Sequence, residues 1–298
     1  MIAIVGNNDG PLVLLRSLQK VGITDVCVGL QKPATPELAQ QYQPYVANDH
    51  FFSDFDEKKL LVKLQTFPVT LLINCFCNFK FIRLLEQYST LNVHLAPLPR
   101  YRGRHPLHWA LINGEREFGI TIHQMTLEID EGNIYWQKLV SVDEGMSVRD
   151  LRKRLIQALE ADFGDFLLRY QRQEVEALPY QDSEATYVAR RYPADSQLTE
   201  WHDRDVIYRK VMALREEANP AYLLVEGQTI PVRQASLGEK HYVGLAAPFI
   251  CRVLPDGVEV VCGDGRTIVL KEFNPKEYSL LLNQKLAFNP GGLGLMQK

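Results

Sequence analysis

Two polar residues, Asn92 and His94, lie two positions apart after a largely apolar part of the chain. In an extended strand this spacing places both side chains on one face. An amide donates hydrogen bonds and an imidazole exchanges a proton near neutral pH, so the pair suits acyl transfer. Farther along, Asp130 precedes Glu131 and Gly132 on a predicted tight turn, and its carboxylate could orient the imidazole. From spacing alone, the favoured interpretation is structural, with Asn92 as a strand-end cap and His94 as a buried histidine whose hydrogen bonds are satisfied.

The segment that follows His94 carries a second group of candidates. Its prolines, Pro97 and Pro99, exclude a regular helix. Tyr101, Arg102 and Gly103 are candidates for contact with a substrate. The Arg102 guanidinium could bind a phosphate, or it could clamp the loop to the domain. The residue types leave both roles open.

The elements around these residues predict an α/β domain with a mostly parallel sheet. A buried strand at residues 2–5, a glycine-bearing turn and a helix over 12–21 are how a nucleotide-binding α/β domain begins. The turn lacks the G-x-G-x-x-G pattern, which argues against dinucleotide binding. Its free amides, with Asn8 among its residues, could instead touch a substrate phosphate, or the turn could only shape a cleft.

A second group of residues follows a predicted buried strand over 70–75. Ligands of open α/β sheets bind beyond the carboxyl ends of the strands, so Phe76, Cys77 and Asn78 are expected to line the cleft. Phe76 could equally pack in the core. The remaining elements predicted for this part of the chain are a strand over 25–30, helices over 37–42, 56–64, 79–87 and 106–113, and a hairpin formed by 119–125 and 133–140, in which Thr121 and His123 share a face.

A long helix over 148–171, capped by Ser147, is predicted from apolar residues four apart. These are Leu151, Leu155, Leu159, Phe163 and Leu167. After a connector, a helix over 203–214 precedes short runs at 222–225, 230–234, 249–253, 257–261 and 267–272, which are separated by turn signals. This pattern indicates a small β-barrel.

Composition narrows the functional classes. The chain has 298 residues, enough for two domains, and a formal net charge of −3, which gives no electrostatic case for nucleic acid or an anionic membrane. No secretory signal or apolar run of about 20 residues is present, so we expect a cytoplasmic protein. The 5 cysteines are scattered and fit reduced thiols. Cys75 and Cys77 lack a second pair at zinc spacing, so no metal site is predicted.

Four motifs together resemble the folate-dependent formyltransferases. They are NVHLAPLPRYRG at 92–103, HPLHWALINGE at 105–115, GITIHQM at 119–125 and EIDEGNI at 128–134. The chain has Ala96 and Pro97 where that family commonly has Ser and Leu. The resemblance implies a Rossmann-like catalytic domain over 1–178, a linker over 179–202 and a smaller OB-like β-barrel domain over 203–298.

The resemblance also implies functional residues. It places Asn92, His94 and Asp130 at the catalytic triad of the family, with N10-formyltetrahydrofolate as co-substrate. The residues implied for the folate site are Phe76, Cys77, Asn78, Asp130 and Gly132, and those for the acceptor are Asn8, Tyr101, Arg102 and Gly103.

The Tyr-x-x-Arg-Arg form at 187–191 most resembles the nucleotide-sugar enzymes, so the predicted acceptor is a dTDP-linked or similar amino-deoxy sugar. Arg190 and Arg191 could clamp a phosphate or staple the linker. The alternative function is methionyl-tRNA formyltransferase, which would favour a basic barrel. From residue 203 onward, 12 Lys and Arg accompany 11 Asp and Glu, a poor surface for RNA. A catalytically idle binding module is a third interpretation, and a homodimer is compatible with an exposed barrel face.

Overall fold

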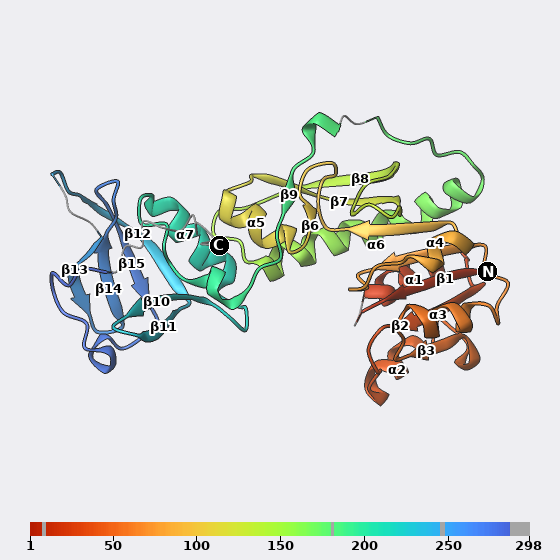
Figure 1. Cartoon of the computed structure of the whole chain (residues 1–298), viewed down its shortest axis with the longest axis horizontal. Coiled ribbons are helices and arrows are strands. Elements are labelled where there is room, and N and C mark those ends of the chain that lie inside the picture. The colour runs from red at the N-terminus through yellow and green to blue at the C-terminus, as the bar shows by residue number, and fades with distance from the viewer. Residues whose placement is uncertain (8–9, 180–181, 245–247, 287–298) are drawn as a thin grey trace, which may run out of the picture. The chain divides into compact units, whose positions relative to one another are not determined.

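The computed structural model describes residues 1–7, 10–179, 182–244 and 248–286 (Figure 1). The chain divides into two compact units. The first contains Met1–Pro106, Glu117–Ser141 and Arg152–Ala189, and the second contains Leu107–Arg116, Val142–Leu151 and the chain from Arg190 onward. The domain boundaries predicted at residues 178 and 202 stay predictions. Among the described residues, no helix combines the length and the apolar character that crossing a bilayer requires.

The first unit is built on a seven-stranded sheet in the order β3-β2-β1-β4-β5-β7-β8. The strands are β1 (Ile2–Gly6), β2 (Val26–Leu30), β3 (Phe51–Ser53), β4 (Leu71–Cys75), β5 (Thr90–His94), β7 (Glu117–Gln124) and β8 (Ile134–Ser141). Strands β1 to β5 pair in parallel, while β7 and β8 form the predicted antiparallel hairpin. Every residue of β1, β2, β4 and β5 is buried, as expected for strands covered on both faces.

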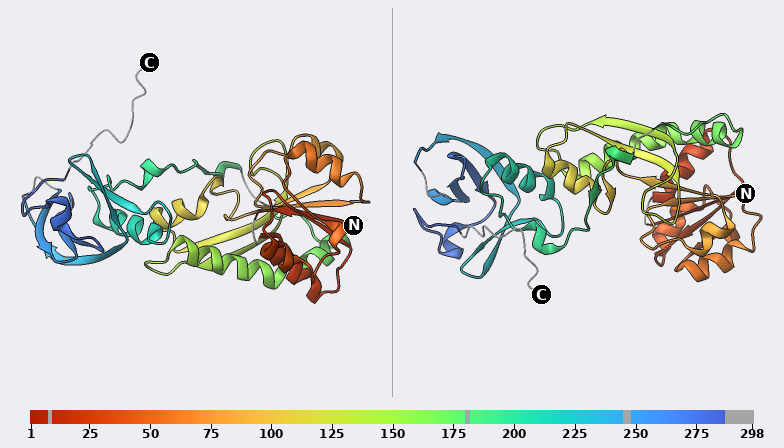
Figure 2. Two further views of the ribbon diagram at one scale, coloured as in Figure 1. Left: turned by 90° about the horizontal axis from the view of Figure 1, so that it is seen from below. Right: turned by 45° about the horizontal axis from the view of Figure 1, so that its top comes forward.

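Helices cover both faces of this sheet. They are α1 (Gly10–Lys20), α2 (Pro36–Tyr42), α3 (Glu57–Leu64), α4 (Arg83–Gln87) and α6 (Val148–Gln171), and α5 (Pro106–Asn113) follows the short strand β6 (Arg102–Gly103). Figure 2 shows α1 and α6 side by side on one face and α3 and α4 on the other, and the Gly164 amide of α6 donates to Ser17 Oγ of α1 at 2.9 Å. The predicted mostly parallel sheet between helices is confirmed.

Helix α6 matches its predicted bounds and apolar face. The five residues at spacing four, Leu151, Leu155, Leu159, Phe163 and Leu167, are all fully buried. At the start of the helix, the Asp150 amide donates to Ser147 Oγ at 3.2 Å, while Ser147 Oγ–H donates to Asp150 Oδ2 at 2.7 Å. This reciprocal cap explains why the helix begins at Val148.

The helix predicted over 79–87 is shorter than expected, because α4 begins only at Arg83. Phe79 and Phe81 stack at 5.1 Å between ring centroids, and Phe81 is buried in the core cluster that contacts α3. A carboxylate oxygen of Glu57 accepts from the amides of Ile82, Arg83 and Leu84. This distant acceptor satisfies the first amides of the helix, and so fixes its start after the aromatic pair.

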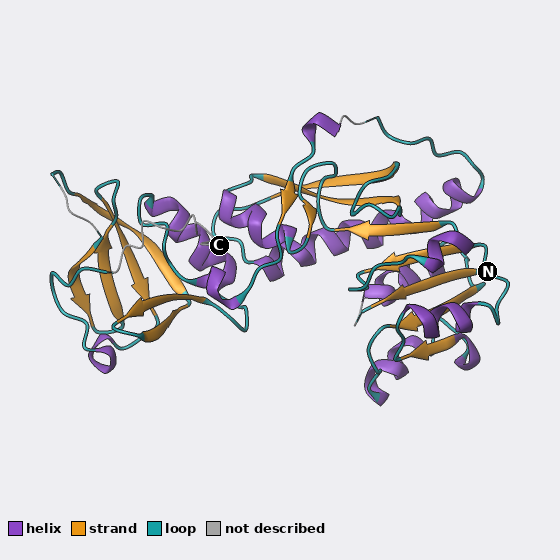
Figure 3. Ribbon diagram, viewed as in Figure 1, coloured by secondary structure: helices purple, strands orange, loops and turns teal. Residues whose placement is uncertain are grey.

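The second unit ends in antiparallel sheets (Figure 3). After α7 (Arg204–Leu214), strands β10 (Ala221–Val225) and β11 (Gln228–Val232) form a hairpin, and β12 (Gln234–His241), β13 (Phe249–Leu254), β14 (Gly257–Val261) and β15 (Arg266–Lys271) form a sheet in the order β12-β15-β14-β13. The prediction of a separate C-terminal β domain is confirmed. Its finer assignment as an OB-like barrel stays a prediction.

Strand β12 was missing from the sequence-based assignment, which ended a strand at Gln234. Its polar residues lie largely on the exposed side, and its pairing with β15 shifts register between Leu237 and His241. A Cβ at Gly238 would lie 2.0 Å from Thr267 Oγ1. The strand therefore depends on close contact with β15, which no local pattern reveals.

Candidate active site

Asn92 and His94 lie on β5, between the parallel strand β4 and the antiparallel strand β7. Both residues are 8% exposed, and each side chain points toward the residues of β7 and its following loop. A buried amide and a buried imidazole on neighbouring positions of one strand need polar partners. Those partners define the site.

Asp130 is brought to these residues by the β7–β8 loop. Its Oδ1 lies 3.6 Å from His94 Nδ1, and its Oδ2 accepts from the Gly103 amide at 2.8 Å. The His94 and Asp130 side chains are 9% and 11% exposed. His123 Nε2 lies 3.0 Å from Asn92 Nδ2 and 3.8 Å from Asp130 Oδ1, so the three residues predicted from the sequence to act together converge. Their catalytic roles stay predictions.

The proton on His94 can be placed from its neighbours. Its Nε2 lies 3.1 Å from the Tyr101 carbonyl oxygen, which can only accept, so Nε2 carries a proton. The nitrogen left to gain or lose a proton is Nδ1, which faces Asp130. A separation of 3.6 Å exceeds a hydrogen bond, and leaves Nδ1 uncommitted to that carboxylate.

His123 is a member of this cluster that the sequence did not assign to the site. It is 1% exposed, its Nε2 lies 3.0 Å from Asn92 Nδ2, and its Nδ1 lies 2.8 Å from the Gln124 carbonyl oxygen. Burial, followed by the nearby His94, lowers the pKa of His123 to about 4, so the ring is neutral near pH 7. Its shared face with Thr121 on β7 was the only sequence signal that it points toward β5.

Asn74 of β4 is a second buried polar residue missed from the sequence. It is 4% exposed, and its Nδ2 donates to Asn92 Oδ1 at 2.8 Å. It stands in the apolar run of β4, where a polar residue is costly unless paired. A polar residue within this apolar run was the sequence signal that could have identified Asn74.

The backbone around the site adopts the left-handed conformation at several non-glycine residues. Phe76, Tyr101 and Asp130 have φ values of 74°, 62° and 54°. At Gly132 φ is 137°, and a Cβ there would lie 2.3 Å from the Gln124 carbonyl oxygen, so only glycine fits. Strained backbone of this kind concentrates at functional sites, and here it sets the direction of the Asp130 side chain.

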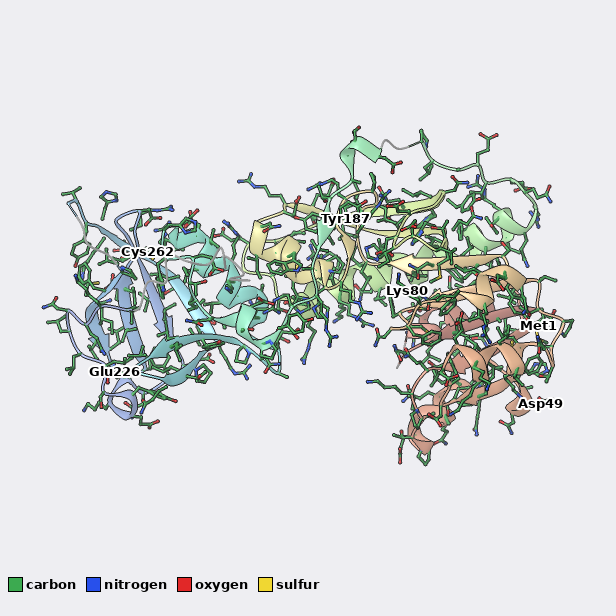
Figure 4. All side chains as sticks on the ribbon, viewed as in Figure 1. Met1, Asp49, Lys80, Tyr187, Glu226 and Cys262 are labelled. Atoms are coloured by element: carbon green, nitrogen blue, oxygen red, sulfur yellow. The ribbon has the colours of Figure 1, made fainter. Side chains whose placement is uncertain are left out.

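Arg102, predicted either to bind a phosphate or to clamp its loop, contacts other residues of the protein through both terminal nitrogens of its guanidinium. Its guanidinium contacts Glu131 at 3.0 Å, Asp182 at 2.9 Å and the Tyr187 hydroxyl at 3.1 Å. Tyr187, labelled in Figure 4, lies on β9 (Tyr187–Val188), which pairs in parallel with β6. These contacts support the clamp, which ties the 182–188 segment to the loop that carries Asp130.

The other residues predicted to contact the acceptor also make internal contacts. The Tyr101 ring packs edge-on against Phe118 with 5.1 Å between centroids and is 5% exposed. The Gly103 amide is bound to Asp130, and with a φ of 109° at Gly103 an added Cβ would lie 2.4 Å from the Val188 carbonyl oxygen. Asn8 lies outside the described residues. A role of these residues in substrate binding stays a prediction.

Three of the residues predicted to line the folate site, Phe76, Cys77 and Asn78, follow β4, at the same end of the sheet as His94. Asn7 Nδ2 donates to the Phe76 carbonyl oxygen at 2.6 Å, and the Asn78 amide donates to Gln31 Oε1 at 2.9 Å. Burial raises the pKa of the Cys77 thiol, which packs against the core cluster beneath α3 and α4. Polar side chains from the ends of β1 and β2 thus hold the backbone of 76–78, and its contact with folate stays a prediction.

Arg190 and Arg191, in the second unit, were predicted to clamp a phosphate or to staple the linker. The Arg190 guanidinium lies 5.5 Å from the Tyr192 ring centroid. Arg191 Nη2 donates to Ser196 Oγ at 2.9 Å, and that hydroxyl donates to the Asn219 carbonyl oxygen at 3.1 Å. Burial lowers the pKa of Arg191. These local contacts support the staple.

Comparison with known proteins indicates the class of enzyme. Residues 52–163 match the family model described as formyl transferase. This stretch includes Asn92, His94 and Asp130. This match confirms the class of enzyme predicted from the sequence, a formyltransferase.

Solved structures share the fold at low sequence identity. An N-formyltransferase from Helicobacter canadensis, in complex with folinic acid and dTDP-3-aminofucose, aligns with a TM-score of 0.69 and 16% identity over 91% of this chain and 99% of that chain. WlaRD, a sugar 3N-formyl transferase in the presence of dTDP and 5-N-formyl-THF, aligns with a TM-score of 0.66 and 16% identity over 92% and 97%. A sugar N-formyltransferase from Shewanella sp. aligns with a TM-score of 0.62 and 22% identity over 78% and 96%.

Proposed function

We propose that this protein transfers a formyl group from N10-formyltetrahydrofolate to the amine of a nucleotide-linked amino-deoxy sugar. The observation that carries the proposal is the convergence of Asn92, His94 and Asp130 inside the stretch that matches the formyl transferase family model. Two structural relatives are described with a folate and dTDP or a dTDP-sugar, which supports the donor and the acceptor class.

In this proposal Asn92 stabilises the oxyanion. When the amine nitrogen attacks the formyl carbon, negative charge builds on the formyl oxygen. Asn92 Nδ2 uses one hydrogen toward His123 and retains a second one. Donated to that oxygen in a site where both asparagine and histidine are buried, this hydrogen lowers the barrier more than it would in water.

His94 moves the proton. A bond forms between the amine nitrogen and the formyl carbon, the bond from that carbon to N10 breaks, and the proton lost by the amine must reach N10. Since Nε2 of His94 is held by the Tyr101 carbonyl, Nδ1 is the atom that accepts this proton and returns it. Asp130, at 3.6 Å, stabilises the imidazolium in between.

The test is formyl transfer by the purified full chain. N10-formyltetrahydrofolate is supplied with dTDP-3-aminofucose, a dTDP-sugar with its amine at another ring carbon, a UDP-linked amino sugar, glycinamide ribonucleotide and methionyl-tRNA. We expect a mass increase of one formyl group on a nucleotide sugar and on neither of the last two acceptors. Transfer only to methionyl-tRNA, or to none of the nucleotide sugars, would overturn the proposal.

The methionyl-tRNA alternative has a separate physical signature. Binding of tRNA through phosphates weakens steeply with salt, whereas the 203–298 segment has nearly balanced charge. We expect no tRNA binding at low ionic strength. A cytoplasmic location and a homodimer remain predictions, and fractionation and light scattering test them.

A further inference from the structure

Three polar side chains form a row across three neighbouring strands. Asn74 of β4 is paired in register with Asn92 of β5, and Asn92 is paired in register with His123 of β7. Asn74 Nδ2 donates to Asn92 Oδ1 at 2.8 Å, and Asn92 Nδ2 lies 3.0 Å from His123 Nε2. All three are at most 8% exposed. We call these three residues the cross-strand row.

Backbone groups fix the direction of every hydrogen bond in this row. At one end the Cys77 backbone N–H, which can only donate, bonds to Asn74 Oδ1 at 3.0 Å. The atom of the Asn74 carboxamide that faces Asn92 is therefore Nδ2, which is a donor. At the other end His123 Nδ1 lies 2.8 Å from the Gln124 carbonyl, which can only accept. His123 Nε2 is therefore the acceptor for Asn92, and the Asn92 amide has one orientation that satisfies both neighbours.

We propose that Asn74 is a positioning residue for the proposed transfer, because it holds the Asn92 carboxamide with its N–H groups, and not its oxygen, toward the reacting centre. This inference rests on the proposed function. If the Asn92 amide turned over, its carbonyl oxygen would take the place of the donor and repel the developing oxyanion. Asn74 has no contact with a substrate in this account and acts only through Asn92.

Asn74→Asp tests the hydrogen bond to Asn92 without changing the size of the side chain, because the two side chains are nearly isosteric. A carboxylate still accepts from the Cys77 amide but cannot donate to Asn92 Oδ1. The Asn92 amide then turns its nitrogen toward the new carboxylate and its oxygen toward His123 Nε2. Because Nδ1 of His123 already donates to Gln124, His123 must take a second proton at Nε2.

The first readout is the titration of His123 by NMR in the protein without substrates. The charged groups around this ring are His94, Asp130 and Arg102. In Asn74→Asp we expect the pKa of His123 to rise toward its ordinary value of 6.5, since the ring gains a hydrogen-bond acceptor and a nearby negative charge. His123→Gln assigns the signal, and Asn48→Asp, an exposed residue of the same unit, is the matched control. An unchanged titration in Asn74→Asp overturns the inference.

The second readout is kinetic. With the nucleotide sugar that the wild type formylates fastest, we expect Asn74→Asp to lower kcat by at least about 10²-fold, the loss typical of removing an oxyanion donor, with KM for the formyl donor unchanged. A KM increase with unchanged kcat would contradict positioning. The NMR readout needs no substrate, so a failure of the proposed function, with no transfer to any sugar, is distinguishable from a failure of this inference.

A second pair of variants covers the case in which Asn74→Asp does not fold. Asn74→Ser retains a hydroxyl that can donate to Asn92, whereas Asn74→Ala leaves Asn92 Oδ1 buried without that donor. We expect Asn74→Ser to retain more kcat than Asn74→Ala. Wild-type kcat in both would overturn the role of Asn74.

Discussion

Two buried ionisable side chains, one in each unit, lie beside a carboxylate in different geometries. In the second unit, Lys210 is 4% exposed and its ammonium lies 2.7 Å from Glu200 Oε1 and 2.6 Å from the Gln197 carbonyl oxygen. In the first unit, His94 Nδ1 lies 3.6 Å from Asp130 Oδ1. The Lys210 pair is closed by short hydrogen bonds, while the His94 pair leaves Nδ1 uncommitted.

This difference in geometry distinguishes a pair with a structural role from a pair that can take part in a reaction. The buried Lys210 ammonium makes short hydrogen bonds to a carboxylate and a carbonyl, so it serves the folded structure and is not free to react. A buried imidazole whose second nitrogen faces a carboxylate beyond hydrogen-bond distance retains a proton-transfer capacity. Substitutions in the His94 pair should change activity, and substitutions in the Lys210 pair should change stability.

The largest effect is expected for Asp130→Ala. Loss of the carboxylate leaves the His94 imidazolium without its stabilising charge and frees the Gly103 amide, so kcat/KM should fall by about 10³-fold. Steady-state formylation of the best nucleotide sugar measures it. Asp165→Ala, an exposed position on α6, is the control and should behave as the wild type. Equal rates for both variants would remove Asp130 from the site.

The next effect concerns pH and His123. Its pKa is about 4 when folded and 6.5 as the ordinary value, so the unfolded chain binds a proton that the folded chain resists. Stability from this group is complete above about pH 6.5 and falls as the pH drops toward 4, by about 3 kcal/mol in all. Urea unfolding of the wild type and His123→Gln at several pH values measures the difference. A pH-independent difference would contradict a neutral His123.

A smaller effect, on stability alone, is expected for Lys210→Met. The substitution leaves Glu200 without its cation, but that carboxylate is 30% exposed and can hydrate, so the second unit should lose about 2 kcal/mol of unfolding free energy. Formylation per folded molecule should not change. Lys276→Met, at an exposed position, is the control for unfolding. A loss of kcat in Lys210→Met would erase the distinction between the two pairs.

The smallest effect is expected for Gly132→Ala. The new Cβ would meet the Gln124 carbonyl oxygen, so the loop must shift and carry Asp130 with it, and kcat should fall on the order of 10-fold. Gly22→Ala is the matched control, because Gly22 also has a positive φ, of 76°, but has no atom within 4 Å of the added Cβ. If the two variants have the same kcat, the position of Asp130 does not depend on this turn.

The sequence predicted the helices and buried strands of the first unit well, because they depend on local patterns. The apolar spacing of α6 and its Ser147 cap are both within one stretch of chain. The late start of α4 was not predicted, since it depends on Glu57, which lies 25 residues before Ile82. Strand β12 was missed for a similar reason, as its exposed polar face lacks the alternation of a half-buried strand.

The candidate site divides in the same way. Asn92, His94 and Asp130 were identified because their motifs resemble a family. Asn74 and His123 were not, because their contacts with Asn92 arise from the register of β4, β5 and β7. Likewise, the contacts of Arg102 that support the clamp are with Glu131, Asp182 and Tyr187, which lie 29, 80 and 85 positions farther along the chain. Register and long-range ion pairing are set by the folded sheet, and spacing along the chain does not encode them.

The most direct test compares single-turnover formyl transfer by the wild type, His94→Ala and His202→Ala, an exposed-histidine control, with binding of 5-formyltetrahydrofolate measured on the same samples. If His94 Nδ1 carries the proton between the two nitrogens, His94→Ala should lose about 10³-fold in transfer rate while binding the folate as the wild type does. Transfer by His94→Ala at the wild-type rate would contradict that role and, with it, the catalytic assignment of the β5 site.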